Sequence, residues 1–296
     1  MTAGVTVAAP RTSMRPSESA GRRALRRFIH HRAAVAGLII LVAIAAMVIL
    51  FPLVYQVDPN DTSLRDRFSS PSAEHPLGTD RLGRDLLARL LDAGRISLAV
   101  GVTAAFLATF VGMVMGLIAG TFGGWVDSLI MRITDVVLSL PFLIAVAVVV
   151  AIVGNGVEIV VLVIGLFIWP EAARIVRSVV LSLREQDFVL AARALGATNG
   201  RIIRRHLVLH SLGPLTVTGT FTVAVALLVE ATLSYLGIGV RPPQASWGNM
   251  LYDAQQLFIL RDYPWYWIPP GLAIFITVLA VNLVGDGLRD ALDPHD

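Results

Sequence analysis

The side chains that usually carry nucleotide and covalent chemistry are missing from this sequence. All 24 basic residues are arginine, and the chain contains neither lysine nor cysteine. A P-loop needs a lysine beside the phosphates, whereas Schiff bases, thiolate catalysis, zinc–cysteine sites and disulfides need lysine or cysteine. We therefore expect no catalytic residue in this chain and no ATP-hydrolysing site of its own.

The histidines offer one spacing that is typical of metal sites. His206 and His210 are four residues apart and would share one helical face. No acidic ligand lies near them in the sequence, which also lacks the His-Glu-x-x-His and Gly-x-Ser-x-Gly patterns. We expect these histidines to cap a helix or lie at a lipid interface, and we expect no metal or cofactor bound by this chain.

Glu230 is the most unusual ionisable residue. It follows 24 residues without an acid or an arginine and precedes another apolar stretch. An ionisable group inside a membrane helix costs several kcal/mol unless it faces a cavity or a partner. Glu230 is therefore a candidate for the transport pathway or for hydrogen bonding between helices, and the second reading is favoured. The pairs Arg132 with Asp135 and Glu171 with Arg174 are spaced to pair on one helix face.

Membrane helices must position these side chains, because the composition is that of a bilayer protein. The residues are 55% hydrophobic and only 15% charged, and the mean hydropathy is +0.72. A transmembrane helix needs ~20 largely apolar residues. Five apolar runs between charges are long enough: 33–56, 96–126, 136–157, 206–229 and 263–285. A sixth, 159–170, reaches full length if it continues through Val176. We expect an all-α integral membrane protein with six transmembrane helices.

The arginines predict how the chain is oriented and divided. With the N-terminus inside, 16 arginines lie in cytoplasmic segments and 8 in external ones, so both termini should be cytoplasmic. The first apolar run is too long for a signal peptide and is expected to be an uncleaved anchor. Tail arginines should set topology and touch anionic lipid rather than nucleic acid. The expected divisions are a basic, partly disordered tail at 1–32, a first transmembrane helix at 33–56, an extracytoplasmic segment at 57–95, and a five-helix core at 96–296.

Small residues and prolines predict local geometry within the spans. The steps between glycines predict a face for close helix packing: Gly112, Gly116 and Gly120. Pro141 and Pro170 are candidates for local helix breaks, although proline is also ordinary in membrane helices.

The cytoplasmic loop at 183–209 is far longer than the ~4 residues that a connector needs. Glu185 and Asp187 would lie at the positive end of a short helix, and Gly196 would end that helix. An apolar stripe runs between them at spacings of three and four residues: Phe188, Ala191, Ala192 and Leu195. This pattern is typical of a helix held by another protein. A helix lying on lipid is an equal alternative on physics alone, favoured by Arg201 and the arginines after it.

Residues 188–197, Phe-Val-Leu-Ala-Ala-Arg-Ala-Leu-Gly-Ala, resemble the EAA loop of binding-protein-dependent ABC importer permeases, the loop that couples to the ATPase subunits. Leu190 stands where that loop usually has glutamate. Three further segments resemble C-type permeases of dipeptide and oligopeptide importers: 75–85, 230–248 and 282–294. The four matches are collinear and cover about residues 25–296.

The resemblance implies a type I ABC importer permease architecture in the bacterial cytoplasmic membrane. It implies a heterodimer with a homologous B-type permease, an extracytoplasmic peptide-binding protein, and two ATP-binding subunits or one fused ATPase chain that would bind ATP and Mg. The residues expected to couple to the ATPase are Glu185, Asp187, Phe188, Ala191, Ala192, Leu195, Gly196 and Arg201. Candidates for contact with the binding protein are Pro242, Pro243 and Trp247. Anchoring of the aromatic ring in the lipid interface is the alternative.

The sequence therefore predicts a permease subunit of an ATP-driven importer of di- or oligopeptides, and not an enzyme in itself. Another cargo on the same machine is one alternative, with nickel, haem and glutathione as examples. A secondary transporter that works alone is a second alternative, although no internal repeat is evident.

Overall fold

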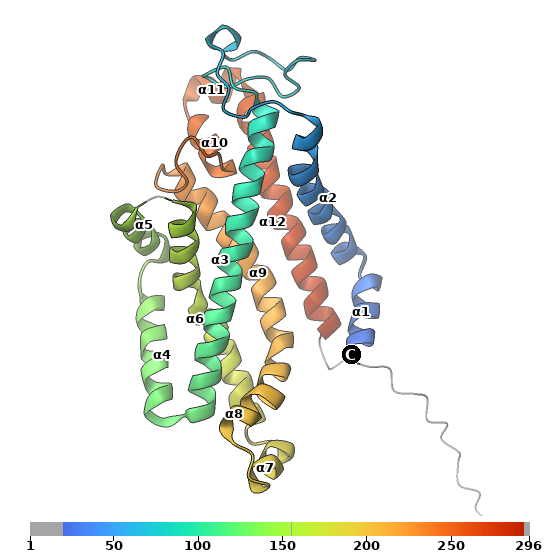
Figure 1. Cartoon of the computed structure of the whole chain (residues 1–296), viewed down its shortest axis with the longest axis vertical. Helices are drawn as coiled ribbons and strands as arrows, with labels where there is room; N and C mark the ends of the chain where they lie inside the picture. Colours follow the sequence, from blue (N-terminus) through green and yellow to red (C-terminus); the bar gives the residue numbers. More distant parts are fainter. Residues whose placement is uncertain (1–19, 155, 293–296) are drawn as a thin grey trace, which may run out of the picture.

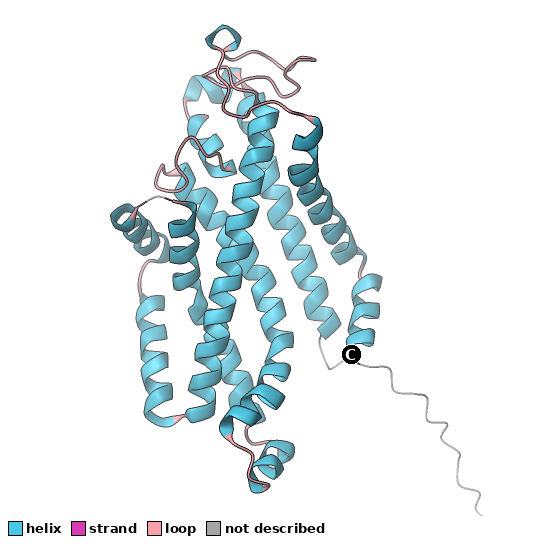
Figure 2. Ribbon diagram, viewed as in Figure 1, coloured by secondary structure: helices cyan, strands magenta, loops and turns pink. Residues whose placement is uncertain are grey.

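The computed structural model describes residues 20–154 and 156–292, which form a bundle of long helices (Figures 1 and 2). Within these residues, strand-like pairing is limited to an isolated bridge between Thr79 and Asp85. Residues 1–19 of the tail that was expected to be basic and partly disordered lie outside the described residues. The expected all-α architecture is confirmed for the part that the structure describes.

Long apolar helices make up most of the bundle. Five helical stretches are long and apolar enough to cross a bilayer, and a bent helix pair makes a sixth if it counts as one span; this search covered the described residues. The single stretches are α2 (Arg32–Val54), α3 (Leu86–Phe122), α6 (Val157–Leu183), Asn199–Tyr235 and α12 (Pro264–Leu292). The fourth of these comprises α8 (Asn199–Ile202), the π-helix η2 (Ile203–Leu207) and α9 (Val208–Tyr235).

The third predicted span needs correction. Instead of one helix over 136–157, the chain forms α4 (Gly124–Ser139) and α5 (Phe142–Val153), which meet at an angle of 91°. The break lies at Leu140, whose extended backbone (φ −77°, ψ 140°) is the conformation favoured before a proline. Pro141 also has no N–H to continue the helix. Pro170, by contrast, lies inside the unbroken α6, which realises the weaker fourth span.

Shorter elements occupy the two ends of the bundle. Figure 1 shows α7 (Asp187–Ala194) and α8 projecting at one end, with α1 (Ala20–His30) and the end of α12 toward the same side. The opposite end carries η1 (Leu64–Asp66), α10 (Trp247–Asp253) and α11 (Leu257–Asp262). Helix α3 begins ten residues before the predicted span, because Asp85 caps it by accepting a hydrogen bond from the Ala88 N–H.

Close packing of α3 against α6 is set by the predicted glycine face. A Cβ on Gly112 would lie 2.5 Å from the Ala172 Cβ, and one on Gly116 would lie 2.6 Å from the Ala173 carbonyl oxygen. A Cβ on Gly120 would lie 2.7 Å from Val180. No real Cβ tolerates such distances, so the glycines are what allow the two backbones to approach, and the packing prediction is confirmed.

Ion pairs join α6 to α4 in a way that the sequence did not predict. Arg177 donates twice to the Asp127 carboxylate at 2.5 Å, and Arg174 donates to Asp135 at 2.6 Å. The pairing of Arg174 with Glu171, and of Asp135 with Arg132, was therefore wrong in partner. Residues three apart on one helix can meet, but here an antiparallel neighbour offers carboxylates within reach of the long guanidinium side chains.

Candidate functional site

The helix α7 forms at the end of the bundle as the sequence predicts. Gln186 has extended backbone before it, and Asp187 occupies its first turn, where a carboxylate interacts favourably with the helix dipole. At the other end Gly196 adopts φ +82°, and the Ala197 N–H donates to the Ala192 carbonyl at 3.0 Å. This hydrogen bond closes a Schellman-type end, which requires the left-handed conformation that glycine adopts without strain.

Two side chains hold α7 on the bundle. Val189 is fully buried in a cluster that includes Ile202 and Leu207. Beside it, the Phe188 ring contacts His206 and stacks on His210, with centroids 5.6 Å apart in both pairs. The structure thus places the two histidines against an aromatic ring, and the His206 carbonyl lies 2.7 Å from Nδ1 of His210.

Apolar side chains on α7 and its C-cap face outward, alongside the exposed Asp187 and Arg193. Leu195 is 89% exposed and Leu190 48% exposed, and Ala191 also faces outward. The predicted docking stripe therefore needs adjustment, since Ala192 is half-buried while Leu190, which the stripe omitted, is outward. Glu185, Asp187, Gly196 and Arg201 are exposed. An apolar patch on a projecting polar loop is typical of a protein contact.

The chain links α7 directly to a long membrane helix. After α7, the stretch Asn199–Tyr235 runs through η2 into α9 and reaches the opposite end of the bundle. Short π-helical segments such as η2 occur frequently at functional sites. Ile202, just before η2, and Leu207, its last residue, are buried in the same cluster as Val189, so a displacement of α7 would act on the start of α9.

Glu230 lies near the far end of α9 and is completely buried. Its Oε2 accepts a hydrogen bond from the Ser97 hydroxyl of α3 at 2.9 Å, and its Oε1 accepts one from Ser234 at 2.7 Å. These contacts favour the interhelical role over a place on an open pathway. The sequence identified the residue, but its partners lie up to 133 positions away and could not be predicted.

The three candidates for contact with the binding protein, two in the loop after α9 and one at the start of α10, differ in exposure. Pro242 and Pro243 are exposed and joined by a cis peptide bond. Trp247 is only 2% exposed, and its indole N–H donates to the Leu90 carbonyl at 3.0 Å. The expectation that Trp247 contacts a docked protein is therefore corrected: its ring packs inside the chain, beside Gly94.

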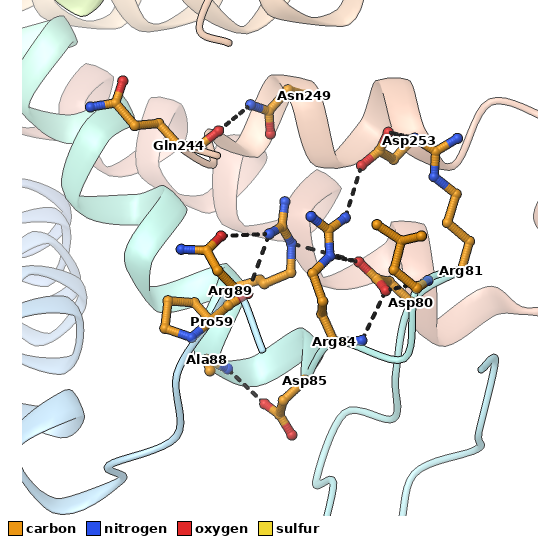
Figure 3. A network of polar contacts seen from close by, with 12 residues as sticks. Pro59, Asp80, Arg81, Arg84, Asp85, Ala88, Arg89, Gln244, Asn249 and Asp253 are labelled. Carbon is orange, nitrogen blue, oxygen red and sulfur yellow. Dashed lines mark hydrogen bonds and ion pairs between the residues drawn. The ribbon is translucent and has the colours of Figure 1, made fainter. Parts of the chain in front are cut away.

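A network of ion pairs around the buried residues Asp80, Arg84 and Arg89, which no sequence pattern indicated, lies at the same outer end (Figure 3). The Arg84 guanidinium donates to Asp80 at 2.5 Å and lies 3.5 Å from Asp253. Arg81 donates to Asp253 at 3.0 Å, and Arg89 lies 3.8 Å from Asp80. Burial raises the pKa of Asp253 despite the neighbouring arginines, which act in the opposite direction.

A second polar cluster ties the outer segment to the end of α2. The Tyr55 hydroxyl donates to Asp85 at 2.9 Å, and His75 Nδ1 lies 2.9 Å from the same carboxylate oxygen. Burial, followed by the hydrogen bond to Asp85, raises the pKa of Tyr55 to about 12. Tyr55 therefore remains a hydrogen-bond donor at any physiological pH.

Comparison with known proteins adds two matches. Residues 112–295 match the model of a family described as binding-protein-dependent transport system inner membrane component. Residues 19–71 match the N-terminal transmembrane domain of oligopeptide transport permease C.

Two similar proteins extend the match to almost the whole chain. A Brucella suis protein, whose name describes a candidate peptide permease, is 44% identical over 273 residues, covering 92% of this chain and 90% of its own length. The dipeptide transport system permease protein DppC of Alkalihalophilus pseudofirmus is 40% identical over 273 residues, covering 92% and 89%.

Proposed function

Because the chain belongs to the family of binding-protein-dependent transport system inner membrane components, we propose that it is a permease subunit of an ATP-driven importer of di- or oligopeptides. It is a multi-pass protein of the bacterial inner membrane. The peptide cargo rests on the names of the relatives, which are a peptide permease in one case and a dipeptide permease in the other.

The observation that carries the proposal is the form of α7. It projects from the bundle, exposes Leu190 and Leu195, and is attached by Val189 to the cluster at the start of α9. An ATPase subunit that closes its groove around this apolar face would pull on α9 without any ATP site in the permease. Only an interaction that differs between two states can drive a conformational switch, so α7 must stay docked while the groove moves.

The assembly proposed around the chain has four further parts. A homologous B-type permease would complete the membrane path, and two ATPase domains, separate or fused, would bind ATP and Mg on the side of α7. A peptide-binding protein would deliver cargo to the end that carries α10 and α11. Both termini would then be cytoplasmic, which agrees with the arginine distribution and with α1 and α12 ending toward the α7 side.

Reconstitution tests this function. Vesicles that hold the complete complex should accumulate a labelled dipeptide only when ATP is inside and the binding protein outside. Unlabelled di- and tripeptides should compete, whereas nickel, haem and glutathione should not. Uptake by the chain without ATPase partners, or uptake that only one of the three other cargoes competes for, would contradict the proposal.

A further inference from the structure

Glu230 is the centre of a hydrogen-bond network that reaches from α9 to the outer loop. The Trp247 N–H donates to the Ser97 hydroxyl oxygen at 3.1 Å, and the Val240 N–H donates to the Ser234 hydroxyl oxygen at 3.1 Å. A backbone N–H can only donate, so each serine oxygen is already used as an acceptor and its own proton is free to point at Glu230. The two carboxylate oxygens receive these two protons.

The N-terminal end of α10 packs closely against α3 and α9 beside this network. A Cβ on Gly248 would lie 2.4 Å from the Ala231 carbonyl oxygen of α9, and a Cβ on Gly94 of α3 would lie 3.0 Å from the Trp247 ring. Ser246 and Asn249 form a reciprocal capping box that fixes the first turn. The N-terminal end of α10 is therefore held on both α3 and α9.

The other end of α10 carries Asp253, which belongs to the ion-pair network of Figure 3. Its partners Arg81 and Arg84 lie in the outer segment, where the Thr79–Asp85 bridge closes a tight loop. Arg81 and Leu82 of this loop are exposed. The seven-residue α10 thus spans the distance from a buried carboxylate in the bundle to an exposed loop on the outer surface.

We propose that α10 acts as a strut: it is a rigid element that transmits a displacement of the outer surface to α3 and α9. Glu230 is the positioning residue that holds its N-terminal end in place. This inference rests on the proposed function, because the displacement would be caused by docking of the binding protein. The stretch Asn199–Tyr235 begins next to α7 and ends next to α10. The binding protein, through α10, and the ATPase, through α7, would therefore act on opposite ends of one helical stretch.

The variant Glu230→Gln tests the anchor. Glutamine keeps the shape of the side chain but has one acceptor oxygen, so one serine proton loses its acceptor and its amide partner is held less firmly. We expect hydrogen exchange of the amides at 240–249 to become roughly tenfold faster, as the loss of one buried hydrogen bond implies. Exchange in α6 should not change, because that helix takes no part in the network.

The matched control is Thr232→Val. Thr232 lies on the same helix two residues away, and its hydroxyl donates to the Leu228 carbonyl of its own helix. Its replacement should leave exchange at 240–249 as in the wild type. A second variant, Ser97→Ala, removes the link to α3 without changing Glu230, and should reproduce the effect if Glu230→Gln does not assemble.

A functional measurement separates a strut from ordinary structural packing. In the reconstituted complex, the concentration of dipeptide-loaded binding protein that half-saturates ATP hydrolysis should rise several-fold in Glu230→Gln, while the maximal rate changes less. The inference is overturned if exchange at 240–249 stays within about twofold of wild type in both variants, or if exchange accelerates without any rise in the half-saturating concentration. A wild-type complex that the loaded binding protein does not stimulate would overturn the proposed function instead, and the exchange measurement would still decide whether Glu230 anchors α10.

Discussion

The two ends of the bundle are stabilised in opposite ways. At the outer end, Asp80 and Arg89 are buried and paired, and the neighbouring loop is fixed by backbone hydrogen bonds to Asp80. At the other end, α7 relies on one buried valine and the contacts of one phenylalanine with two histidine rings, and it leaves leucines exposed. The side chains at the outer end therefore find their partners within the chain. The exposed leucines at α7 do not, and a second protein would supply the packing that they lack.

The difference teaches where rigidity is needed. Buried charges that have all their partners fix one geometry, because any displacement leaves an unpaired charge in a medium of low dielectric. Because only a few apolar residues attach α7 to the bundle, α7 can move as a unit together with a protein bound to its exposed side. We call the outer ion-pair network of Asp80, Arg84, Arg89 and Asp253 the platform, because it is rigid. We call α7 the handle, because it can be displaced by a bound protein.

The largest effect should come from breaking the platform with Asp80→Ala. This change leaves the buried Arg89 without a carboxylate partner and leaves Arg84 with Asp253 alone. Removing one partner of a buried ion pair typically costs about 3–5 kcal/mol. The free energy of unfolding in detergent should fall by that amount. Asp262→Ala, which removes an exposed partner 3.7 Å from Arg261, is the control and should cost about 0–1 kcal/mol. Equal effects of the two variants would show that the outer network is not the stabilising feature.

A smaller effect is expected from loosening the handle with Val189→Ala. Loss of two buried carbon atoms costs about 2 kcal/mol, and nearly all of it should appear as local opening of α7. Proteolysis or hydrogen exchange at 185–197 should accelerate while the unfolding of the bundle changes little, and transport per ATP hydrolysed should fall. Leu190→Ala, the exposed neighbour, should leave exchange in the isolated chain unchanged. If both variants behave alike, Val189 does not attach α7.

Gly196→Val should strain the end of the handle by about 1–2 kcal/mol, because φ +82° is unfavourable for a residue with a Cβ. A Cβ there would meet nothing within 4 Å, so the effect comes from the backbone and not from a clash. ATP hydrolysis should become uncoupled from peptide uptake. Gly196→Asn should be milder, since asparagine tolerates this conformation, and Gly200→Val is a control without the positive φ. Normal uptake by Gly196→Val would argue against α7 as the coupling element.

The smallest effect concerns pH at the platform. Because burial raises the pKa of Asp253, the folded state holds its proton more tightly than the unfolded state does. This contribution to stability is complete below the unfolded pKa of about 3.9 and is lost as pH rises through the folded value. We therefore compare the unfolding free energy of wild type with that of Asp253→Asn. The value for wild type minus the value for the variant should decrease as the pH rises from 3.5 toward neutrality, by at most ~1.4 kcal/mol per pH unit. A difference that grows with pH would mean that the arginines outweigh burial.

The sequence was sufficient for features that depend on local pattern. The stop at Gly196, the glycine face on α3 and most of the membrane helices follow from residues near in the chain, whereas the helix that packs on the glycine face, α6, does not. The two prolines show where local pattern fails: Pro141 ends a helix at a bend, whereas Pro170 is buried within a continuous one. Only the tertiary surroundings distinguish them.

The candidate site was predictable in place but not in orientation. The predicted stripe omitted the buried position, Val189, because three apolar residues stand in a row at 188–190 and their spacing does not show which of them faces the bundle. The outer network joins Arg81 to Asp253 across 172 positions, and no local pattern indicates such a pair. The resemblance implied that Trp247 contacts a docked protein, yet Gly94 leaves room for its ring inside the chain.

The most direct measurement uses the absence of cysteine from the chain. In Leu195→Cys the single thiol would sit on the outward face of α7 and carry a benzophenone photocrosslinker. In the assembled transporter, irradiation should join this chain to an ATPase subunit both without nucleotide and with ATP bound. A thiol that reacts equally fast with a water-soluble maleimide in the presence and absence of the ATPase, and that never crosslinks to it, would contradict the account.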